Sequence, residues 1–516
     1  MSEPSETRMI LIRGGRVYDP AGDTDRPALR DVVIEGDTIL SVSAPDEDGD
    51  AKRRVAAMAT QGRAEVIDAR DRLVVPGFVN AHYHSYDTLA KGLIEDAPFD
   101  LWALQTQPAF YGRRSREELR LRTLLGAMEC LKAGITTVQD MCTLVPQDED
   151  TLDVIADAYA EVGIRVVFAL ALRDLGDLDI APFLPEIHDE AVRRAVTGAP
   201  RDAAEDLAFA ESQIRRRPAA GLWHWGVSAS GPQRSSNALL EGVATLSERH
   251  GLPIFTHVYE TRAQVAKARR VYGPQGGSMI RHMAEVGILG PRTTMAHGVW
   301  IAPDEIAAIA ASGASLAHNP LSNMKLKSGV APIRALRSEG VNLGIGCDNC
   351  SCGDCQNMFQ GMKMFCLLAG VADPEPTGVH AVHALEAATL GGARAVGLGE
   401  ALGAVAPGRK ADLSLVDLSG LAFTPLNSAV RQLVFSETGS GIDTVLVGGR
   451  VVVRDRRLTT VDEAAFRAEL ADIMPAFRRD FDGLRRTSDA AAPALREALR
   501  RLDEVDVGLE RHLARR

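Results

Sequence analysis

Apolar runs recur along the middle of the chain, and segments with helical spacing separate most of them. Eight such runs follow one another: LVVPGFVNAHYH, GITTVQD, IRVVFALAL, LWHWGVSAS, LPIFTHVYE, TTMAHGVW, ASLAHNP and NLGIGCDN. The helical patterns between them include EELRLRTLLGAMECLKAG, TLDVIADAYAEVG, ALLEGVATLSERHG and PDEIAAIAASGA. Eight strands that alternate with helices are typical of a closed parallel barrel rather than an open sheet. The pattern therefore predicts an α/β protein built on a (β/α)₈ TIM barrel.

The two ends of the chain carry strand-like segments of another kind. Near the start, branched residues alternate with Gly, Asp and Pro in MILIRGGRVYDP, RDVVIEGDTILSVSAP and AEVIDARDRLVVP, with no convincing helix between them. The charged insertion DEDGDAKRRVAAMATQGR is expected to form an exposed excursion. The same pattern of branched residues punctuated by Gly and Asp returns near the end of the chain, in GRKADLSLVDL and GIDTVLVGGRVVVRDRRL. We therefore expect one small β domain that combines both ends of the chain.

These patterns divide the chain into four segments. We expect the first part of a composite β-sandwich at residues 1–75, the barrel at 76–404, the second part of the sandwich at 405–460 and a helical C-terminal extension at 461–516. The extension has the pattern of charged amphipathic helices. We interpret it as a solvated helical tail packed on the barrel, with a subunit contact as the alternative.

Composition narrows the class of protein and its partners. At 516 residues, with 46% hydrophobic and 25% charged residues, the chain resembles a globular protein of more than one domain. The net charge of −11 is spread without a basic cluster, which argues against nucleic acid or a membrane surface as a partner. We see no signal peptide or membrane-spanning run, and the seven cysteines favour a cytoplasmic protein with reduced thiols. A homodimer or homotetramer is a further expectation.

Candidate chemistry gathers at the predicted strand ends. Residues 79–87 read VNAHYHSYD, and because side chains alternate along a strand, His82 and His84 project to the same side. Alone, this pair is either a metal site or two satisfied histidines in a loop mouth. In such barrels the reactive groups collect at the C-terminal strand ends. There the sequence also places His257, Glu260, His297, His318 and Asp348. Imidazole and carboxylate together predict a site for zinc or another first-row divalent ion.

The segments PGFVNAHYH, HVYET, MAHGVWI, HNPLSNMKLKSGVAPI, GCDN and GRKADLSLVD resemble the amidohydrolase superfamily, in the right order over roughly residues 9–460. They are most similar to the branch that holds chlorohydrolases, guanine-type and S-adenosylhomocysteine-type deaminases, and cytosine deaminases. The resemblance implies that the metal ligands are His82, His84, His257 and Asp348. It also implies an acid–base pair, Glu260 and His297, beside the metal.

A single metal ion is expected, because the fourth predicted strand, LWHWGVSASG, has no Lys, Glu or Cys to bridge two ions. Zn²⁺ is the expected ion, and Fe²⁺, Mn²⁺ or Co²⁺ would fit the same ligands. His224, inside this strand, is interpreted as a packed structural histidine. In the expected mechanism Asp348 accepts a proton from water, Glu260 carries protons to the leaving nitrogen, and His297 hydrogen-bonds the developing oxyanion. The alternative for Glu260 is a helix cap.

The residues expected to bind substrate are His318, Asn319, Gln105 and Trp102, and Gln107 is a further polar candidate. A strand-end packing role is the alternative for His318. Three more residues of the same loop resemble positions that shape this branch's pocket: Ser322, Asn323 and Lys325. Three others depart from the family pattern or add aromatic groups near the mouth: Lys91, Tyr83 and Tyr86.

The segment CDNCSCGDC allows two interpretations. Its spacing, C-x2-C-x-C-x2-C, could form a structural zinc site from Cys347, Cys350, Cys352 and Cys355. However, Asp348 lies inside the segment, and thiolates there would compete with it for metal. The alternative is a run of small residues that packs a tight loop.

Three functions remain open from the sequence. The first is an aminohydrolase that deaminates a nitrogen heterocycle, such as a purine, pyrimidine or triazine. The second uses the same metal site to cleave an amide, urea or carbamate in a small non-ring substrate. The third is a scaffold protein without catalysis, which is disfavoured because no expected ligand is missing. Each of the first two requires a small nitrogenous substrate.

Overall fold

The eight predicted apolar runs form the parallel strands of a closed barrel. The computed structural model describes residues 8–106, 114–176, 178–186, 190, 193, 196, 200–372 and 378–512. Two of the eight runs are each divided into two short strands, so the barrel strands are β6 (Phe78–His84), β7 (Ile135–Cys142), β8 (Arg165–Leu170), β9 (Trp223–Trp225), β10 (Val227–Ser228), β11 (Ile254–Val258), β12 (Thr293–His297), β13 (Ser315–His318), β14 (Asn342–Ile345) and β15 (Asp348–Asn349).

The barrel closes between its first and last strands. The strand order is β10-β11-β12-β13-β14-β6-β7-β8-β9, and β9 and β10 are consecutive pieces of one strand. At the closing seam, β6 pairs with Ile345 of β14 and then with both residues of β15. Strands β7 and β8 are buried along their whole length, as expected for parallel strands covered on both faces. The predicted TIM barrel is confirmed.

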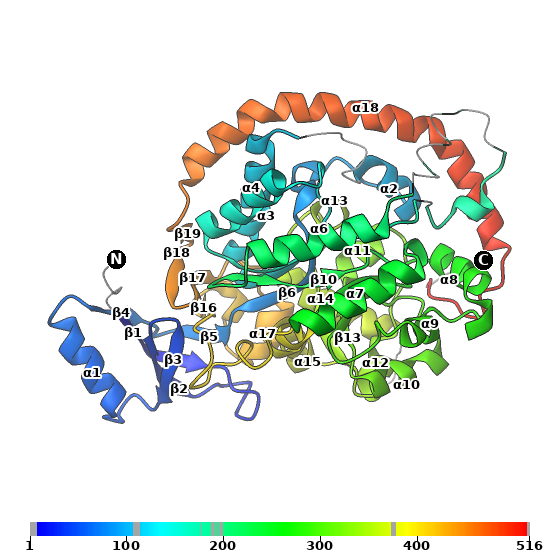
Figure 1. The fold of residues 1–516 in the computed structure, drawn as a ribbon. Helices are drawn as coiled ribbons and strands as arrows, with labels where there is room; N and C mark the ends of the chain where they lie inside the picture. The colour runs from blue at the N-terminus through cyan, green and yellow to red at the C-terminus, as the bar shows by residue number, and fades with distance from the viewer. Residues whose placement is uncertain are drawn as a thin grey trace.

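Helices surround the barrel and follow most of its strands. They are η1 (Ser85–Ala90), α2 (Phe99–Thr106), α3 (Arg116–Lys132), α4 (Glu149–Val162), α6 (Ala203–Arg216), η4 (Pro232–Arg234), α7 (Asn237–His250), α8 (Arg262–Val271), α9 (Met279–Glu285), α10 (Pro303–Ser312), α11 (Pro320–Lys325), α12 (Ile333–Ser338), α13 (Cys350–Gly353), α14 (Met358–Ala372), α15 (Ala381–Ala388), α16 (Leu390–Ala395) and α17 (Ala429–Phe435). Figure 1 shows these helices packed around the barrel.

A mixed sheet at one side of the barrel uses strands from both ends of the chain (Figure 1). Its strands are β1 (Met9–Val17), β2 (Leu29–Glu35), β3 (Thr38–Ser43), β4 (Ala64–Asp68), β5 (Arg72–Pro76), β16 (Leu413–Asp417), β17 (Ile442–Val447), β18 (Arg450–Arg454) and β19 (Arg457–Leu458). The two sets join where β5 pairs with β16. Apolar side chains from both sets share one core, including Ile12, Val32, Ile34, Leu413, Leu415 and Leu446. The predicted composite β-sandwich is confirmed.

The charged insertion in the N-terminal part contains a helix, α1 (Asp50–Ala59), that the sequence analysis did not anticipate. Ala51, Val55 and Met58 recur with helical spacing and pack against a small cluster that includes Met9 and Leu11. Only Val55 of this helix is fully buried. The apolar stripe is narrow and the surrounding residues are charged, so the helical period is weak in the sequence.

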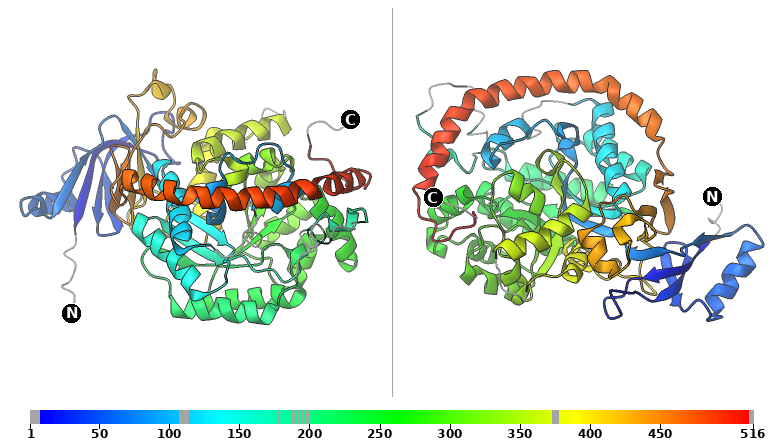
Figure 2. Two further views of the ribbon diagram at one scale, coloured as in Figure 1. Left: turned by 90° about the horizontal axis from the view of Figure 1, so that it is seen from above. Right: turned by 180° about the vertical axis from the view of Figure 1, so that it is seen from behind.

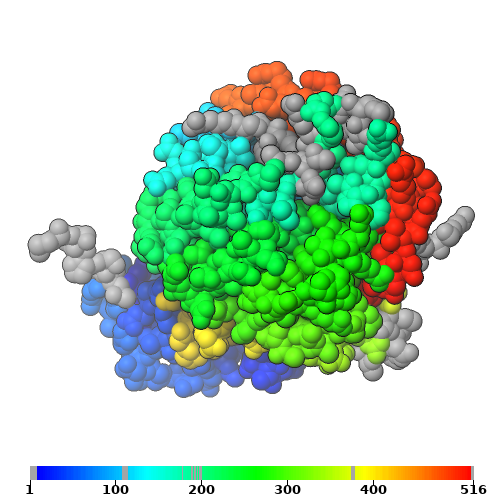
Figure 3. All heavy atoms as spheres, turned by 45° about the vertical axis from the view of Figure 1, so that its right-hand side comes forward, coloured from blue at the N-terminus to red at the C-terminus, as the bar shows by residue number. Residues whose placement is uncertain are grey.

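The C-terminal extension is one helix, α18 (Glu463–Asp503), rather than several. Its 41 residues extend about 60 Å. The helix contains Pro475 and Pro493, and it curves as it crosses the barrel (Figures 1 and 2). It packs on α2 and α3, and Figure 3 shows the C-terminal part of the chain (red) against the barrel (green). Just beyond the helix, the carbonyl oxygens of Val505 and Val507 accept hydrogen bonds from Arg262 and Arg269 of α8. In the described part of the chain, every helix is too short or too polar to cross a membrane.

A buried ion pair joins the barrel to the β domain. Arg165 of β8 donates through Nε and Nη2 to the two carboxylate oxygens of Asp412, at 3.0 and 2.9 Å. Asp412 also accepts a hydrogen bond from the backbone N–H of Gly448, at 2.8 Å. The two charged side chains are 5% and 3% exposed. The pair therefore fixes the first residue of a barrel strand against two turns of the β domain.

We expect Arg165→Leu to reduce the free energy of unfolding by about 3–5 kcal/mol, because it leaves the Asp412 carboxylate buried and unpaired. Urea titration followed by circular dichroism measures this. The control is Arg281→Leu, which removes the exposed pair between Arg281 and Asp304 and should cost much less. Equal effects of the two substitutions would contradict a structural role for the buried pair.

Candidate functional site

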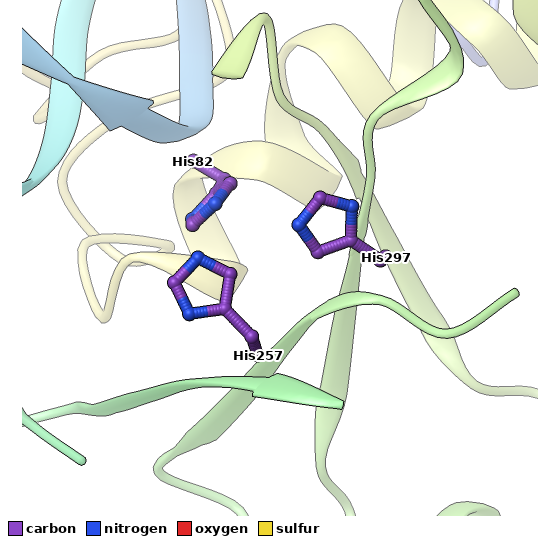
Figure 4. Close-up of side chains that lie close together, drawn as sticks. All are labelled: His82, His257 and His297. Carbon is purple, nitrogen blue, oxygen red and sulfur yellow. The ribbon is translucent and has the colours of Figure 1, made fainter. Parts of the chain in front are cut away.

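Four histidines and two acids from different strand ends meet at one point of the barrel. His82 and His84 lie on β6, His257 on β11, His297 ends β12, and Asp348 begins β15. Figure 4 shows three of these imidazoles, from separate strands, pointing toward one another. All except His257, which is half-buried, are less than 5% exposed, and so is Glu260, which follows β11. The structure thus brings together every residue expected to bind metal or move protons.

The potential ligand atoms of this cluster lie close together. His84 Nε2 is 3.2 Å from His257 Nε2, and Asp348 Oδ1 is 3.6 Å from His82 Nε2 and 3.5 Å from His84 Nε2. Two overlapping groups, each with ligand atoms within 4.8 Å of one another, are His82 with His257 and His297, and His82 with His84 and Asp348. No other group of three or more potential metal ligands occurs among the described residues.

The donor set fits a divalent metal ion. His84 Nδ1 is 2.5 Å from the carbonyl oxygen of Met141, and His257 Nδ1 contacts that of Ser230. Each ring can therefore donate from Nδ1 and leave Nε2 free for a metal. His82 Nε2 is buried and has no hydrogen-bond partner among the described residues. Burial, followed by the neighbouring imidazoles, lowers the pKa of His82 and His257 well below the usual range, which favours the neutral, metal-binding form.

Several residues at this point have a left-handed backbone. The φ angles of Tyr259, His297 and Asp348 are 49°, 73° and 60°. A non-glycine residue in this region costs about 1–3 kcal/mol and persists only where its surroundings enforce it. At His297 and Asp348 this conformation accompanies a side chain that lines the cavity, which is typical of a functional site, whereas the Tyr259 hydroxyl group donates to Glu305 outside the cavity.

Glu260 and His297 lie beside the candidate metal ligands. His297 Nε2 is 3.8 Å from Glu260 Oε2 and 3.8 Å from Asp348 Oδ2. Burial and then the charge of Asp348 raise the pKa of Glu260 well above its usual value, which favours a protonated carboxyl group. Thr261 is the N-cap residue of α8, and the Glu260 side chain lines the cavity. The helix-cap alternative for Glu260 is therefore not supported.

The loop after β13 supports His297 from behind. Asn323 Oδ1 is 2.9 Å and Asn319 Nδ2 is 3.3 Å from His297 Nδ1. Ser322 is buried in the same loop, and Lys325 donates to the carbonyl oxygen of Ser351 at 3.0 Å. These side chains orient the site from outside the cavity, because none of them lines it.

The cavity above the cluster has an empty volume of about 620 Å³, its mouth included. Of the residues expected to bind substrate, Trp102 lines it and donates from its indole N–H to Ser351 Oγ at 2.7 Å. Gln105 instead donates to Ser488 of α18, and it is not a lining residue. Helix α2 is buried on nearly all sides, so its sequence does not show which face meets the cavity. Gln107 lies outside the described residues.

His318 is packed rather than exposed to the cavity. It is 1% exposed, and neither ring nitrogen has a hydrogen-bond partner in the described part of the chain. Burial, and then the charge of His297, lowers its pKa to about 3. Its ring contacts the edge of Phe365, with centroids 5.8 Å apart. This geometry favours the packing alternative.

Tyr86 and Tyr83 have different surroundings. Tyr86 lines the cavity, whereas Tyr83 is fully buried and lies against Gly126 of α3, where a Cβ would clash with its hydroxyl group. The expectation that both tyrosines lie near the mouth is wrong for Tyr83, because alternation along β6 turns it away from the barrel interior. Lys91 pairs with Glu129 at 2.7 Å, away from the cavity.

Several residues that line the cavity were not predicted from the sequence. Thr143, Arg173 and Ser230 follow the second, third and fourth barrel strands, and Asn349 follows Asp348. The rule that functional groups gather at C-terminal strand ends could have found these four. Phe99 of α2 and Arg234 of η4 had no comparable signal. The Arg234 guanidinium lies over the Phe99 ring, 5.4 Å from its centroid, and its Nη2 donates to buried Asp179 at 2.8 Å.

The cysteine-rich segment forms a tight loop around Asp348. Cys352 Sγ contacts the carbonyl oxygen of Asn349, and Cys355 Sγ contacts the side chain of Gln360. The potential metal-binding groups of the described chain include none of the four cysteines. Burial is the main cause of a raised pKa at each of these four thiols, and a raised pKa disfavours the thiolate form that binds metal. The structure therefore supports the packing alternative.

Helix α13 and the chain after β6 hold this loop together. Asp87 accepts hydrogen bonds from the backbone N–H groups of Cys350 and Ser351, at 3.1 and 3.2 Å, and from the Ser351 hydroxyl group.

His224 lies away from the cavity, where its Nε2 is 3.2 Å from Arg165 Nη1.

Residues 73–452 match the model of the amidohydrolase family. The chain is 32% identical over 471 residues to a 5′-deoxyadenosine deaminase of Methanothermobacter thermautotrophicus, covering 91% of this chain and 99% of that protein. It is 32% identical over 449 residues to a 5-methylthioadenosine/S-adenosylhomocysteine deaminase of Thermococcus onnurineus, covering 87% and 95%.

Solved structures share the fold. An adenosine deaminase of Xanthomonas campestris with bound zinc is 26% identical, with a TM-score of 0.75, over 93% of this chain and 100% of that one. An atrazine chlorohydrolase of Arthrobacter aurescens, at 23% identity and a TM-score of 0.79 over 90% and 100%, shows the fold alone.

The chain belongs to the amidohydrolase family, as its sequence motifs led us to expect. It is a hydrolase that acts on carbon–nitrogen bonds, and its histidine and aspartate cluster is compatible with a divalent metal ion.

We expect about one metal equivalent per chain, lost on replacement of both His82 and His84 by alanine, because two imidazole ligands disappear. Plasma emission spectrometry of protein purified without chelator measures the content. The control is His224→Ala, which removes a histidine away from the cavity and should keep the metal. A full equivalent in the double variant would contradict the assignment of the site.

Proposed function

We propose that the protein is a metal-dependent deaminase that removes the amino group from the purine ring of an adenosine analogue by attack of water. The observation that carries this proposal is the convergence of four histidines, Asp348 and Glu260, of which all except His82 line one cavity with aromatic residues in its walls. The activities for which the relatives are named, 5′-deoxyadenosine deamination among them, favour an adenosine analogue as the substrate.

We assign the metal ligands as His82, His84, His257 and Asp348, and the ion as a single Zn²⁺. The donor set of three imidazoles and one carboxylate suits zinc. The fourth barrel strand ends at Ser228 and is followed by Ala229 and Ser230, so no Lys, Glu or Cys is present there to bridge a second ion. When bound, such an ion supplies a water molecule whose pKa falls from about 16 toward about 7.

Different side chains around the metal position carry out the separate proton transfers of the reaction. Asp348 Oδ2, on the side of His297, accepts a proton as water attacks the ring carbon that bears the amino group. Glu260 enters protonated, because its pKa is raised, and its carboxyl group delivers a proton to the leaving nitrogen. His297, held at Nδ1 by Asn323, presents Nε2 to hydrogen-bond the attacking oxygen. Ammonia and the ring carbonyl compound are the products.

The cavity walls suit a planar ring. Phe99, Trp102 and Tyr86 are the aromatic residues that line the cavity, and Thr143, Ser230 and Asn349 add polar groups to its lining. The buried walls exclude bulk water from the reacting carbon, which strengthens the electrostatic contribution of Glu260 and Asp348.

The proposal also includes a cellular compartment and an oligomeric state. All seven cysteines are free, six of them buried, which fits a reducing compartment such as the cytoplasm. We propose a homodimer or homotetramer, for which the apolar side chains Leu367 and Val371, 46% and 60% exposed on α14, offer a contact surface.

We expect Glu260→Gln to lower kcat by roughly 10²–10⁴, because the amide cannot transfer protons, while metal content stays at the wild-type level. Steady-state ammonia release together with plasma emission spectrometry tests both parts. Glu118→Gln is the matched control, since Glu118 is a buried glutamate that pairs with Arg114 outside the cavity. Full activity of Glu260→Gln would eliminate Glu260 as the proton carrier.

A substrate panel separates deamination from the hydrolysis of amides, ureas or carbamates. We expect 5′-deoxyadenosine, 5-methylthioadenosine and S-adenosylhomocysteine to release ammonia, with kcat/KM at least about 100-fold above that for phenylureas and carbamates, because the aromatic cavity and Glu260 serve a ring-bound amine. Release of an amine and carbon dioxide from the carbamates, without ammonia from any heterocycle, would favour the second function instead.

A further inference from the structure

Two buried amide side chains hold the backbone on either side of Asp348. The backbone N–H of Cys347 donates to Asn80 Oδ1 at 2.8 Å. Asn80 Nδ2 donates to Gln356 Oε1 at 2.9 Å, and Gln356 Nε2 donates to the carbonyl oxygen of Asp348 at 2.8 Å. Both amide side chains are fully buried. We refer to Asn80 and Gln356 together as the amide clamp.

The amide clamp bridges an interruption in the closing seam of the barrel. Strand β6 pairs with Ile345, and again with residues 348–349, but the described backbone pairs skip residues 346–347. The chain there passes very close to β6, since a Cβ on Gly346 would lie 2.7 Å from the Cβ of His82. The side-chain Oδ1 of Asn80 accepts the hydrogen bond from the Cys347 N–H at this interruption.

The interruption coincides with the strained backbone of Asp348. Its φ of 60° is costly for a residue with a Cβ and requires support from the surroundings. Of the two hydrogen bonds between the clamp and this backbone, one holds the peptide group immediately after the Asp348 Cα, and the other holds the peptide group between Gly346 and Cys347, one residue earlier in the chain. This backbone conformation also sets the direction of the carboxylate, whose Oδ1 faces His82 and His84 and whose Oδ2 faces His297.

We propose that Asn80 and Gln356 are positioning residues that keep Asp348 in its left-handed conformation and so aim its carboxylate at the histidines. This inference rests on the proposed role of Asp348 as metal ligand and proton acceptor. Gln356 is the more specific member, because its amide closes the bridge and its Nε2 also lies 3.4 Å from Cys350 Sγ in the same loop. Without it, the Asp348 carbonyl and the Asn80 amide lose buried partners.

The test compares Gln356→Met with Gln432→Met. Gln432 is a suitable control because its amide also joins backbone groups: it donates to the carbonyl oxygens of Ala422 and Pro425 and accepts from the N–H groups of Asn427 and Ser428. It does not line the cavity. Each protein is loaded with Co²⁺, and its visible absorption spectrum, kcat, KM and thermal midpoint are measured.

For Gln356→Met we expect an altered Co²⁺ spectrum and a kcat lower by about 10- to 100-fold, because supporting partners of metal ligands have effects of this size. KM should change by less than about threefold, since the aromatic walls are intact. Gln432→Met should lower the thermal midpoint while its spectrum and kcat remain those of the wild type.

If Gln356→Met loads Co²⁺ with the wild-type spectrum and keeps wild-type kcat, the positioning role is overturned, even if the thermal midpoint falls. If this variant does not fold, Gln356→Glu replaces it; that variant keeps the volume and the acceptor for Asn80, loses the donor to Asp348 at neutral pH, and is judged by the same readouts. Failure of the wild-type protein to bind Co²⁺ would instead overturn the proposed metal site itself.

Discussion

Strands β6 and β15 lie next to each other because the parallel sheet closes on itself, and this pairing brings His84 and Asp348 within 3.5 Å. The first and last strands of the barrel are about 260 residues apart in the chain, so no local pattern of the sequence holds these groups together. The other histidines enter from β11 and β12 on the same rim. The position of each reacting group therefore depends on a closed and continuous sheet, and a loss of register at the seam would affect all of them.

Burial of so many polar groups has an electrostatic cost that the arrangement itself reduces. Charged imidazoles would repel one another here, and burial keeps His82 and His257 neutral. Glu260 avoids a second negative charge beside Asp348 because its pKa is raised. The remaining demand, for a positive charge near the Asp348 carboxylate, is what a divalent cation satisfies. The burial and charge of the cluster are thus compatible with a divalent metal ion.

The sequence predicts the barrel well because each strand is a continuous apolar run and parallel strands end at one rim. The histidines and acids at those ends could be grouped for the same reason. Alternation along β6, applied strictly, would also have shown that Tyr83 points away from the side of His82 and His84. The contribution of Phe99 and Arg234 could not be predicted, because they lie on a helix and a turn whose orientations depend on tertiary contacts. Helix α1, with Val55 as its one fully buried residue, shows how a narrow apolar stripe escapes detection.

The composite sheet also constrains how the chain can fold as it is made. Strand β5 forms early, but its partner β16 follows the entire barrel, and Val74 pairs with Leu415. At a synthesis rate of about 5–20 residues per second, the roughly 340 intervening residues take about 20–70 s to emerge. During that interval the β5 edge has no strand from the C-terminal set to pair with. The β domain therefore cannot be completed until all the barrel strands have been synthesised, although its own first strands are made before them.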